Sequence, residues 1–447
     1  SLNSESGNKL NFFGFNFNDR VNLSNNGNVK WDSYGFGTDF LLLPSSASVI
    51  IHGILAYSNY DIGIAEPNRS SRTSTINGFN MGLDFTYFMD QNELKYGVSV
   101  IGNKTDFAGT RPDGGIDSDV QNNTEMAGFV KYRLVKNRFV LEPSLRLHYY
   151  ASLAQFSPEP RLGFKYNISE KLRFKFAGGF FTQNFLSTRS DQDVVNLFAG
   201  FLSSPESLQD AFGARIENPL QKARHAMFGF EYDVNDAISV NVEPYVKDFN
   251  QLVNVNRNRI FGTDAAYVVE KGLAKGIDFS IRYQKNNLMI QSGYSLAKVD
   301  REFGNEQYPP NFDRRHNANF LGTYAFGKNK SYEFSARWNL GSGFPFTPTR
   351  GFYERNLQGG IDSDFTSENG DLGILYGDEN SKRLPYYHRL DISAKRSFDL
   401  SKGRVLEINA DVVNVYNRKN IFYFDRITSQ RVDQLPILPS VGLRLKF

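Results

Sequence analysis

Few residues of this chain stand at spacings that could carry out bond chemistry. Its five histidines are isolated from one another, at His52, His148, His225, His316 and His388. A zinc hydrolase places two histidines one helical turn apart, as in H-E-x-x-H, and this sequence lacks that spacing. The G-x-S-x-G turn of serine hydrolases and the glycine-rich phosphate loops are also missing. The sequence therefore predicts a protein that is not an enzyme and needs no cofactor.

One acidic pattern, Gly-Gly-Ile-Asp-Ser-Asp, occurs twice, at 114–119 and 359–364. Carboxylate oxygens at this spacing suit calcium, so a loop-stabilising ion is one interpretation. Solvated turn residues are the other, because Asp, Gly and Ser are ordinary turn formers. The candidate calcium ligands are Asp117, Asp119, Asp362 and Asp364.

Composition narrows the class of protein that could position these residues. The 447 residues include no cysteine, which excludes disulfide frameworks and thiolate metal sites. A net charge of +3 without basic runs disfavours nucleic-acid binding. Phenylalanine and tyrosine number 40 and 23, yet the mean hydropathy is −0.44 and no apolar run is long enough for a membrane helix. Many aromatics without hydrophobic runs are typical of a membrane β-barrel, in which only every second residue meets lipid.

Strict two-residue alternation runs through many segments, and the end of the chain shows it most clearly. In residues 440–447 every odd position is apolar and every even position is polar or glycine. Residues 332–340 and 389–400 repeat the pattern. A period of two excludes an amphipathic helix. We expect the apolar positions to face lipid, and positions such as Arg444 and Lys446 to face the lumen.

About 18 such strands are predicted, and their connections fall into two alternating classes. Short turns, such as those near 90–92 and 285–287, alternate with long polar loops. The longest loops are about 185–221, 250–266, 345–385 and 419–436. This is the layout of an antiparallel up-and-down transmembrane β-barrel, with periplasmic turns and extracellular loops. No linker interrupts the pattern, so residues 1–447 are predicted to form one outer-membrane β-barrel domain.

The last residues also resemble the C-terminal signal that the barrel-assembly machinery reads. A polar residue, a glycine, an apolar residue and a terminal aromatic stand in the required order, as Ser440, Gly442, Leu445 and Phe447. An ordinary last strand that happens to end on phenylalanine is the alternative.

Four further segments resemble TonB-dependent receptors of the Bacteroidetes type. They are E-P-R-L-G at 159–163, D-R-R-H-N at 313–317, G-S-G-F-P-F-T-P at 341–348 and D-V-V-N-V-Y-N-R-K-N at 411–420. The matches occur in family order, and the resemblance covers roughly residues 140–447. The individual motifs look structural rather than catalytic.

The resemblance implies an N-terminal plug inside the barrel, a short segment that pairs with the TonB protein, and a barrel of about 22 strands. This chain supplies about 18 of those strands and nothing that looks like a plug, so we expect the plug and the first strands upstream of it. A self-contained barrel is the alternative, because 18 is an even number and closed bacterial barrels have even strand numbers.

An importer of this kind would take up a scarce nutrient, such as an iron chelate, cobalamin, a peptide or a glycan, without bond chemistry. Its expected partners are the lipid bilayer, the barrel-assembly machinery, the nutrient, a surface lipoprotein and, through the plug, the TonB complex. Nucleic acid is not an expected partner. A passive porin, or a structural or secretion-associated outer-membrane barrel, is the alternative hypothesis.

Substrate contacts are expected in the outer loops and on the lumen wall. The stretch 194–202 is apolar within a polar loop, so Phe198 and Phe201 could contact a ligand, unless this stretch is a short helix packed onto the barrel mouth. The lumen-facing candidates on the last strands are Arg389, Asp391, Glu407, Asn409 and Asp411. The alternative for these five is the ordinary polarity of a barrel interior.

Overall fold

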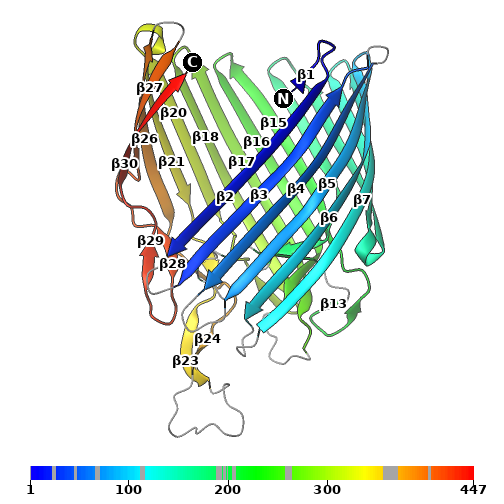
Figure 1. Cartoon of the computed structure of the whole chain (residues 1–447), viewed down its shortest axis with the longest axis vertical. Helices are drawn as coiled ribbons and strands as arrows, with labels where there is room; N and C mark the ends of the chain where they lie inside the picture. The colour runs from blue at the N-terminus through cyan, green and yellow to red at the C-terminus, as the bar shows by residue number, and fades with distance from the viewer. Residues whose placement is uncertain are drawn as a thin grey trace.

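Alternating apolar and polar residues give this chain one continuous sheet, which curls into a wide ring (Figure 1). The computed structural model describes residues 2–22, 27–44, 48–65, 71–110, 116–187, 194, 198, 200–203, 208–256, 264–355, 371–400 and 404–446. In this described part the sheet has 22 strands, paired antiparallel except at a single residue pair between β13 (Leu208–Gln209) and β17 (Tyr267–Lys285). The 3-10 turns are η2 (Ala151–Leu153) and η3 (Lys328–Lys330), and none of the described helical segments has the length and hydropathy to span a membrane.

Eighteen of the described strands are long and follow one another around the ring. They are β2 (Lys9–Asn22), β3 (Asn28–Leu42), β4 (Val49–Ala65), β5 (Arg72–Met89), β6 (Asn92–Thr110), β7 (Ile116–Lys136), β8 (Phe139–Tyr150), β9 (Gln155–Asn167), β10 (Leu172–Gln183), β15 (Gln221–Asn235), β16 (Ile238–Val255), β17, β18 (Leu288–Phe303), β20 (His316–Phe326), β21 (Tyr332–Gly341), β26 (Tyr387–Asp399), β27 (Val405–Val413) and β30 (Leu438–Lys446). The predicted all-β antiparallel barrel fold, with about 18 long strands in this chain, is confirmed.

The remaining strands are short. Those that join the main sheet are β1 (Leu2–Asn3), β13, β14 (Arg215–Ile216) and β19 (Glu306–Tyr308). Those that form separate hairpins are β11 (Phe185–Ser187) with β12 (Phe201–Ser203), β22 (Pro345–Phe346) with β25 (Lys382–Arg383), β23 (Thr349–Arg355) with β24 (Asp371–Tyr376), and β28 (Ile421–Phe424) with β29 (Arg431–Asp433).

The two ends of the ring differ in their connections. At one end, the turn end, tight turns use Asp90, Asn137 and Asn286, each with φ near +53°, a conformation that Asp and Asn tolerate best after glycine. The long connections meet at the other end, the loop end, where Figure 1 shows β23, β24, β28 and β29 projecting from the ring. The predicted loop at 250–266 is shorter than expected, because a bulge between Phe249 and Leu252 lets β16 continue its pairing with β17.

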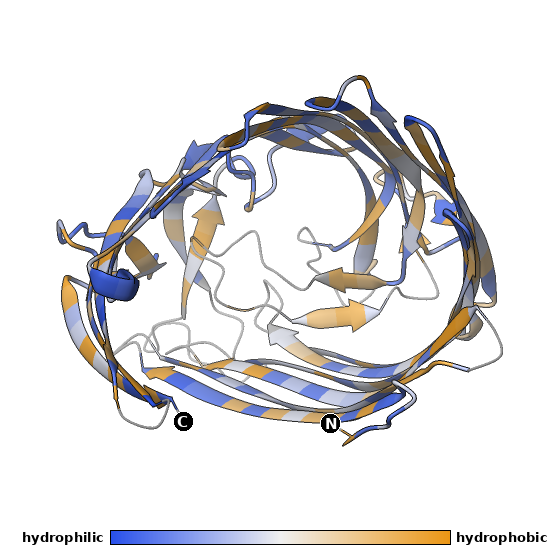
Figure 2. Cartoon of the chain, turned by 90° about the horizontal axis from the view of Figure 1, so that it is seen from above, coloured by the Kyte–Doolittle hydropathy of each residue, from blue (hydrophilic) through white to orange (hydrophobic). Residues whose placement is uncertain are grey.

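A hairpin inside the ring identifies which face of the sheet is the lumen. β11 and β12 contact β5, β6 and β7 as well as β16, which only a segment inside the ring can do, and Figure 2 shows short strands there. The wall residues that bond to this hairpin, such as Ser74 and Asn123, belong to the polar face of their strands. The opposite, outer face is rich in exposed Phe, Tyr, Leu and Val.

The last strand follows the same rule. On β30 the outward Leu443 is 73% exposed, whereas the amine of Lys446 donates to Glu407 on the lumen side. Arg444 pairs across the ladder with the same Glu407. The predicted facing of this strand is confirmed for these residues, and Phe447 lies outside the described residues.

One seam interrupts the ring. β2 and β30, the first and last long strands, each pair with one long neighbour, and no ladder joins them to each other within the described residues. Only β1 lies on the free edge of β2, opposite Lys9 and Leu10. In lipid, unpaired backbone groups along such edges cost several kcal/mol each, by the general rule for membrane-spanning sheets (~2–7 kcal/mol per group).

Candidate functional site

The lumen wall carries a network of opposite charges. Glu231 on β15 accepts from Arg173 and Lys175 on β10, at 3.2 and 2.6 Å. Glu142 on β8 lies 3.3 Å from Lys131 and 3.5 Å from Arg133 on β7. These pairs remain partly exposed, so each contributes little to stability. Together they line the lumen with solvated charge of both signs, which suits passage of a polar or charged solute.

The hairpin β11–β12 fills part of the mouth at the loop end. Its backbone N–H at Phe201 donates to the Ser74 hydroxyl over 3.0 Å, and its Ser203 hydroxyl accepts from the Asn123 amide. The side chain of Asn184 donates to the same Asn123 over 3.0 Å. Wall strands β5 and β7 therefore hold the hairpin through buried polar groups, which are costly to leave unpaired.

Two apolar clusters anchor the same segment. Phe198, which is 1% exposed, packs against Val29, Ile62 and Ile64 on β3 and β4 and against Tyr423 on β28. The second cluster consists of Leu186, Leu202, Leu208 and Val253. The hydrophobic cores of the described part thus lie in the mouth, where loops meet the wall.

The predicted ligand contacts in this segment have different surroundings. Phe198 is enclosed by wall residues, so a ligand reaches it only if the segment moves. Phe201 is 37% exposed and meets the ring of Tyr60 edge-on at 6.0 Å, which leaves part of it open to the lumen. Of the apolar stretch 194–202, the structure describes Val194, Phe198, Gly200 and the start of β12, so the short helix considered from sequence lies largely outside the described residues.

The five lumen candidates of the last strands lie on one patch of wall. Ser393 and Lys395 on β26 pair with Asp411 and Asn409 on β27, so the polar positions of both strands share the lumen face. Arg389, Asp391 and Glu407 belong to the same face and are engaged: Arg389 bonds to Asp391 over 3.0 Å and Glu407 to Lys446 over 2.7 Å. The structure brings the five together, and their contact with a substrate stays a prediction.

An aromatic stripe on β2 was missed by sequence reasoning. The ladder places Phe13, Phe15 and Phe17 on the lumen face, where they are 43%, 53% and 54% exposed. Their rings lie over glycines: a Cβ at Gly35 would meet the Phe15 ring at 2.6 Å, and one at Gly37 would meet the Phe13 ring at 2.6 Å. Alternation alone predicts that these phenylalanines face lipid. No sequence signal reveals that they face the lumen instead.

The segments at 313–317 and 341–348 hold each other at the loop end. Asp313 is 1% exposed and forms an ion pair with Arg383, whose guanidinium also donates to the carbonyls of Asp313 and Gly343, each over 3.1 Å. Gly343 is required there, because a Cβ would stand 1.5 Å from the Leu384 carbonyl oxygen. We call this unit the Asp313–Arg383 clasp.

Arg314 adds an aromatic contact to the clasp. Its guanidinium lies 4.1 Å from the centroid of the Phe344 ring, a cation–π distance, and burial lowers the pKa of this guanidinium from its ordinary value. A Cβ at Gly341 would meet the Arg314 guanidinium at 2.4 Å. The glycines of the G-S-G motif therefore make room for the loop and for this side chain.

The segment at 411–420 forms a second structural turn. Asn414 has φ +54°, donates its N–H to Asp391 over 2.9 Å and donates its amide to the carbonyls of Arg418 and Leu435. Asn420 exchanges bonds with the backbone of His388. Asn414 and Asn420 thus tie the loop before β30 to the start of β26.

The proposed calcium ligands are only partly within the described residues. The carboxylate of Asp119 accepts from Tyr267 and Gln121, both over 2.9 Å. Asp362 and Asp364 lie outside the described residues, as does the side chain of Asp117. Over the residues that the structure describes, no group of three or more His, Asp or Glu side chains could hold a metal ion.

Comparison with known proteins finds likeness in structure only. No family model matches the sequence, and no curated protein matches it. The ferric citrate transporter FecA in its unliganded form superposes with a TM-score of 0.59 at 11% identity, over 94% of this chain and 62% of that one. The ferric-catecholate import receptor Fiu of Escherichia coli K12 gives 0.64 at 11%, over 94% and 64%.

A third match comes from another organism. The FrpB iron transporter of Neisseria meningitidis (F5-1 variant) gives a TM-score of 0.62 at 12% identity, over 94% of this chain and 64% of that one. Among the first five solved structures that match, the chain spans between 56% and 66% of their length. At this identity the likeness shows the fold, which is that of TonB-dependent outer-membrane transporter barrels.

Proposed function

We propose that this chain is the barrel of a bacterial outer-membrane importer that depends on TonB, with its loop end outside the cell. The observation that carries the proposal is the fold: a wide ring of long antiparallel strands with a charged lumen, similar over 94% of the chain to the ferric citrate transporter FecA. The motif resemblance to Bacteroidetes receptors supports the same family from the sequence side.

A plug outside these 447 residues completes the proposed importer. Two features of the described part support it. Phe13, Phe15 and Phe17 form an exposed apolar stripe on the lumen face, which an inserted domain would cover. The free edges of β2 and β30 would accept further strands, which would bring the number of long strands from 18 toward the 22 that the family resemblance implies.

The proposed cargo is a scarce nutrient, namely an iron chelate, cobalamin, a peptide or a glycan. We propose that Phe201 and the patch formed by Asn409, Asp411 and their neighbours contact it during passage, without bond chemistry. The barrel-assembly machinery would read Ser440, Gly442, Leu445 and Phe447. A surface lipoprotein could cap the loop end, and a calcium ion at the Asp-x-Asp loops remains a proposal.

A passive or structural barrel is the second candidate, and one observation favours it. The hairpin β11–β12 lies in the mouth and is held there by the wall, so these residues by themselves narrow the pore. A constriction made by an inward-folded loop needs no plug and no energy source. This alternative predicts size-limited diffusion.

Reconstitution separates the two. The full-length gene product and residues 1–447 alone are placed in proteoliposomes, and conductance and nutrient uptake are measured with and without an energised TonB complex. We expect concentrative uptake from the full-length protein only, and passive leakage or no flux from residues 1–447. Concentrative, TonB-dependent uptake by residues 1–447 would refute the need for a plug, and equal passive flux from both proteins would favour the porin.

A further inference from the structure

The wall opens locally between β9 and β10, near the loop end. Their ladder stops at Arg161 opposite Gly179, although β9 and β10 both continue. Asn167 donates its N–H toward β8, to Arg138, so by alternation the even-numbered residues of β9 turn their backbone groups toward β10. At Pro158 and Pro160 that group has no hydrogen to donate, and the pairing ends.

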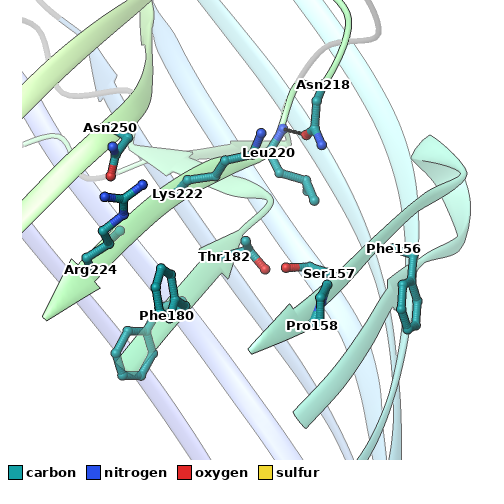
Figure 3. Close-up of a pocket in the computed structure, with 12 residues that line it drawn as sticks. Phe156, Ser157, Pro158, Phe180, Thr182, Asn218, Leu220, Lys222, Arg224 and Asn250 are labelled. Atoms are coloured by element: carbon teal, nitrogen blue, oxygen red, sulfur yellow. Dashed lines mark hydrogen bonds between the residues drawn. The ribbon is translucent and has the colours of Figure 1, made fainter. Parts of the chain in front are cut away.

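The buried Glu159 takes over the bonds that the ladder gives up. Its carboxylate accepts the N–H of Thr182 over 2.9 Å and the hydroxyl of Thr182 over 2.7 Å, and it pairs with Arg161 at 2.6 Å. The two strands are therefore held apart rather than frayed. The separation leaves a cavity of about 310 Å³ between Phe156 and Pro158 on one side and Phe180 and Thr182 on the other (Figure 3).

The cavity lies at the edge of the apolar belt on the outer face. Toward the turn end, three neighbouring strands are aromatic or aliphatic at their outward positions. These positions are Leu162, Phe164, Tyr166, Phe174, Phe176, Phe180, Phe228, Phe230 and Tyr232. Toward the loop end the same face changes to Thr182, Arg224 and Lys222. An outward change from aromatic to basic residues marks the membrane interface, where lipid headgroups lie.

Two cations border the cavity from β15. The guanidinium of Arg224 lies 5.7 Å from the centroid of the Phe180 ring, and Lys222 stands directly opposite Thr182. In the part of the chain that the structure describes, neither Lys222 nor Arg224 has an ion-pair partner; the nearest acidic position on the ladder is Asp248, opposite Arg224. Asn218 and Asn250 also line the cavity (Figure 3).

We propose that this notch binds the phosphorylated headgroup of a lipid in the outer leaflet, an inference that rests on the proposed outer-membrane location. Arg224 and Lys222 would contact the phosphate, because guanidinium and ammonium groups pair with phosphate oxygens through charge-assisted hydrogen bonds. The acyl chains would lie against Phe156, Pro158 and Phe180 on the apolar side. Free phosphate could make only the contacts with Arg224 and Lys222, because it has no acyl chain to pack against the aromatic residues.

The test uses lipid A, a doubly phosphorylated and multiply acylated glycolipid, as the probe. The full-length protein is inserted into phosphatidylcholine vesicles with or without lipid A, extracted in mild detergent, and its retained lipid A is counted by native mass spectrometry. The notch variant is Lys222→Gln with Arg224→Gln. The control is Arg20→Gln with Lys30→Gln, which removes the same charge from the loop-end side of β2 and β3.

We expect wild type and the control to retain one lipid A that the notch variant loses, with occupancy at least about tenfold lower, and Arg224→Lys to keep most of it. Equal retention by the notch variant would overturn the inference. So would displacement of lipid A by millimolar inorganic phosphate, since that result makes the notch a simple anion site. Insertion is scored first by protease protection: a wild type that fails to insert counts against the proposed function, whereas normal insertion without retained lipid A counts against the notch alone.

Discussion

Arg383 illustrates how one side chain joins segments far apart in the sequence. It binds the carboxylate of Asp313 and the carbonyls of Asp313 and Gly343, and thereby connects the loop before β20 to the loop after β21. Removing one member of such a pair leaves a charge that is only 1% exposed without its partner. At this scale, the motifs at 313–317 and 341–348 shape the loop end of the barrel.

We therefore expect Arg383→Ala to destabilise the barrel by roughly 2–3 kcal/mol, less than for a wholly buried pair because Arg383 is itself partly exposed. Urea unfolding followed by tryptophan fluorescence in lipid vesicles would measure it. The matched control is Arg350→Ala, whose ion pair with Asp378 is solvated, with side chains 65% and 77% exposed. An equal loss in both variants would contradict a special role for the clasp.

The facing of the last strand gives a second residue-scale prediction. Leu443→Arg places a charge on the outer face and should cost about 2–4 kcal/mol if the position lies near the bilayer midplane. Asn409→Arg, on the lumen face of the neighbouring strand and opposite Gly442, should cost much less. The yield of folded barrel in vesicles at graded urea concentrations distinguishes them, and a larger cost at Asn409 would reverse the assignment of the two faces.

At the scale of elements, the hairpin β11–β12 decides how open the mouth is. Its anchors come from three places: the polar groups of β5 and β7, the Phe198 cluster and the Leu202 cluster. A segment held by two small clusters and a few hydrogen bonds has a lower local stability than the strands around it. The hairpin is therefore the described element best suited to move when a solute passes.

Phe198→Ala should release this element. Truncation of a buried phenylalanine costs about 3–5 kcal/mol, enough to undock a small cluster while the ladders of the wall persist. We expect a higher single-channel conductance and faster trypsin cleavage at Arg215, with unchanged heat stability of the barrel. Phe201→Ala, at a half-exposed position of the same hairpin, is the control and should change both readouts little. Unchanged cleavage in Phe198→Ala would mean that other contacts hold the segment.

At the scale of the whole molecule, the seam between β2 and β30 determines whether the long strands of this chain close a barrel by themselves. Every other neighbouring pair of long strands forms a ladder within the described residues. β2 runs toward the loop end and β30 toward the turn end, so the two could pair directly or accept an even number of strands between them. The proposed importer requires the second arrangement.

Cysteine cross-linking tests whether further strands lie between β2 and β30. The chain has no native cysteine, so only the introduced cysteines can form a disulfide. In the full-length protein, Asn16→Cys should fail to form a disulfide with Val441→Cys or Leu443→Cys, since inserted strands separate their Cα atoms by more than about 7 Å. Asn16→Cys with Tyr34→Cys, a directly opposed pair on β2 and β3, is the positive control. Efficient linkage of β2 to β30 would favour the self-contained barrel.

Local sequence was sufficient for the features that depend on neighbours along the chain. The two-residue alternation in 332–340, 389–400 and 440–447 determined the strands and which residues share a face, because side chains on a strand alternate whatever the partner is. The turn residues Asp90, Asn137 and Asn286 marked the hairpins for an equally local reason, their tolerance of positive φ.

Tertiary structure alone decided the features that depend on partners far away in the sequence. The inward facing of Phe13, Phe15 and Phe17 follows from the register of β2 on β3. Alternation within one strand shows which residues share a face, but it does not show which face is the lumen. Phe198 is buried because β3, β4 and β28 converge on it, and Arg383 finds Asp313 across 70 residues. The gap at Pro158 and Pro160 becomes a notch only because β10 continues past it beside Arg224, a juxtaposition that no single segment specifies.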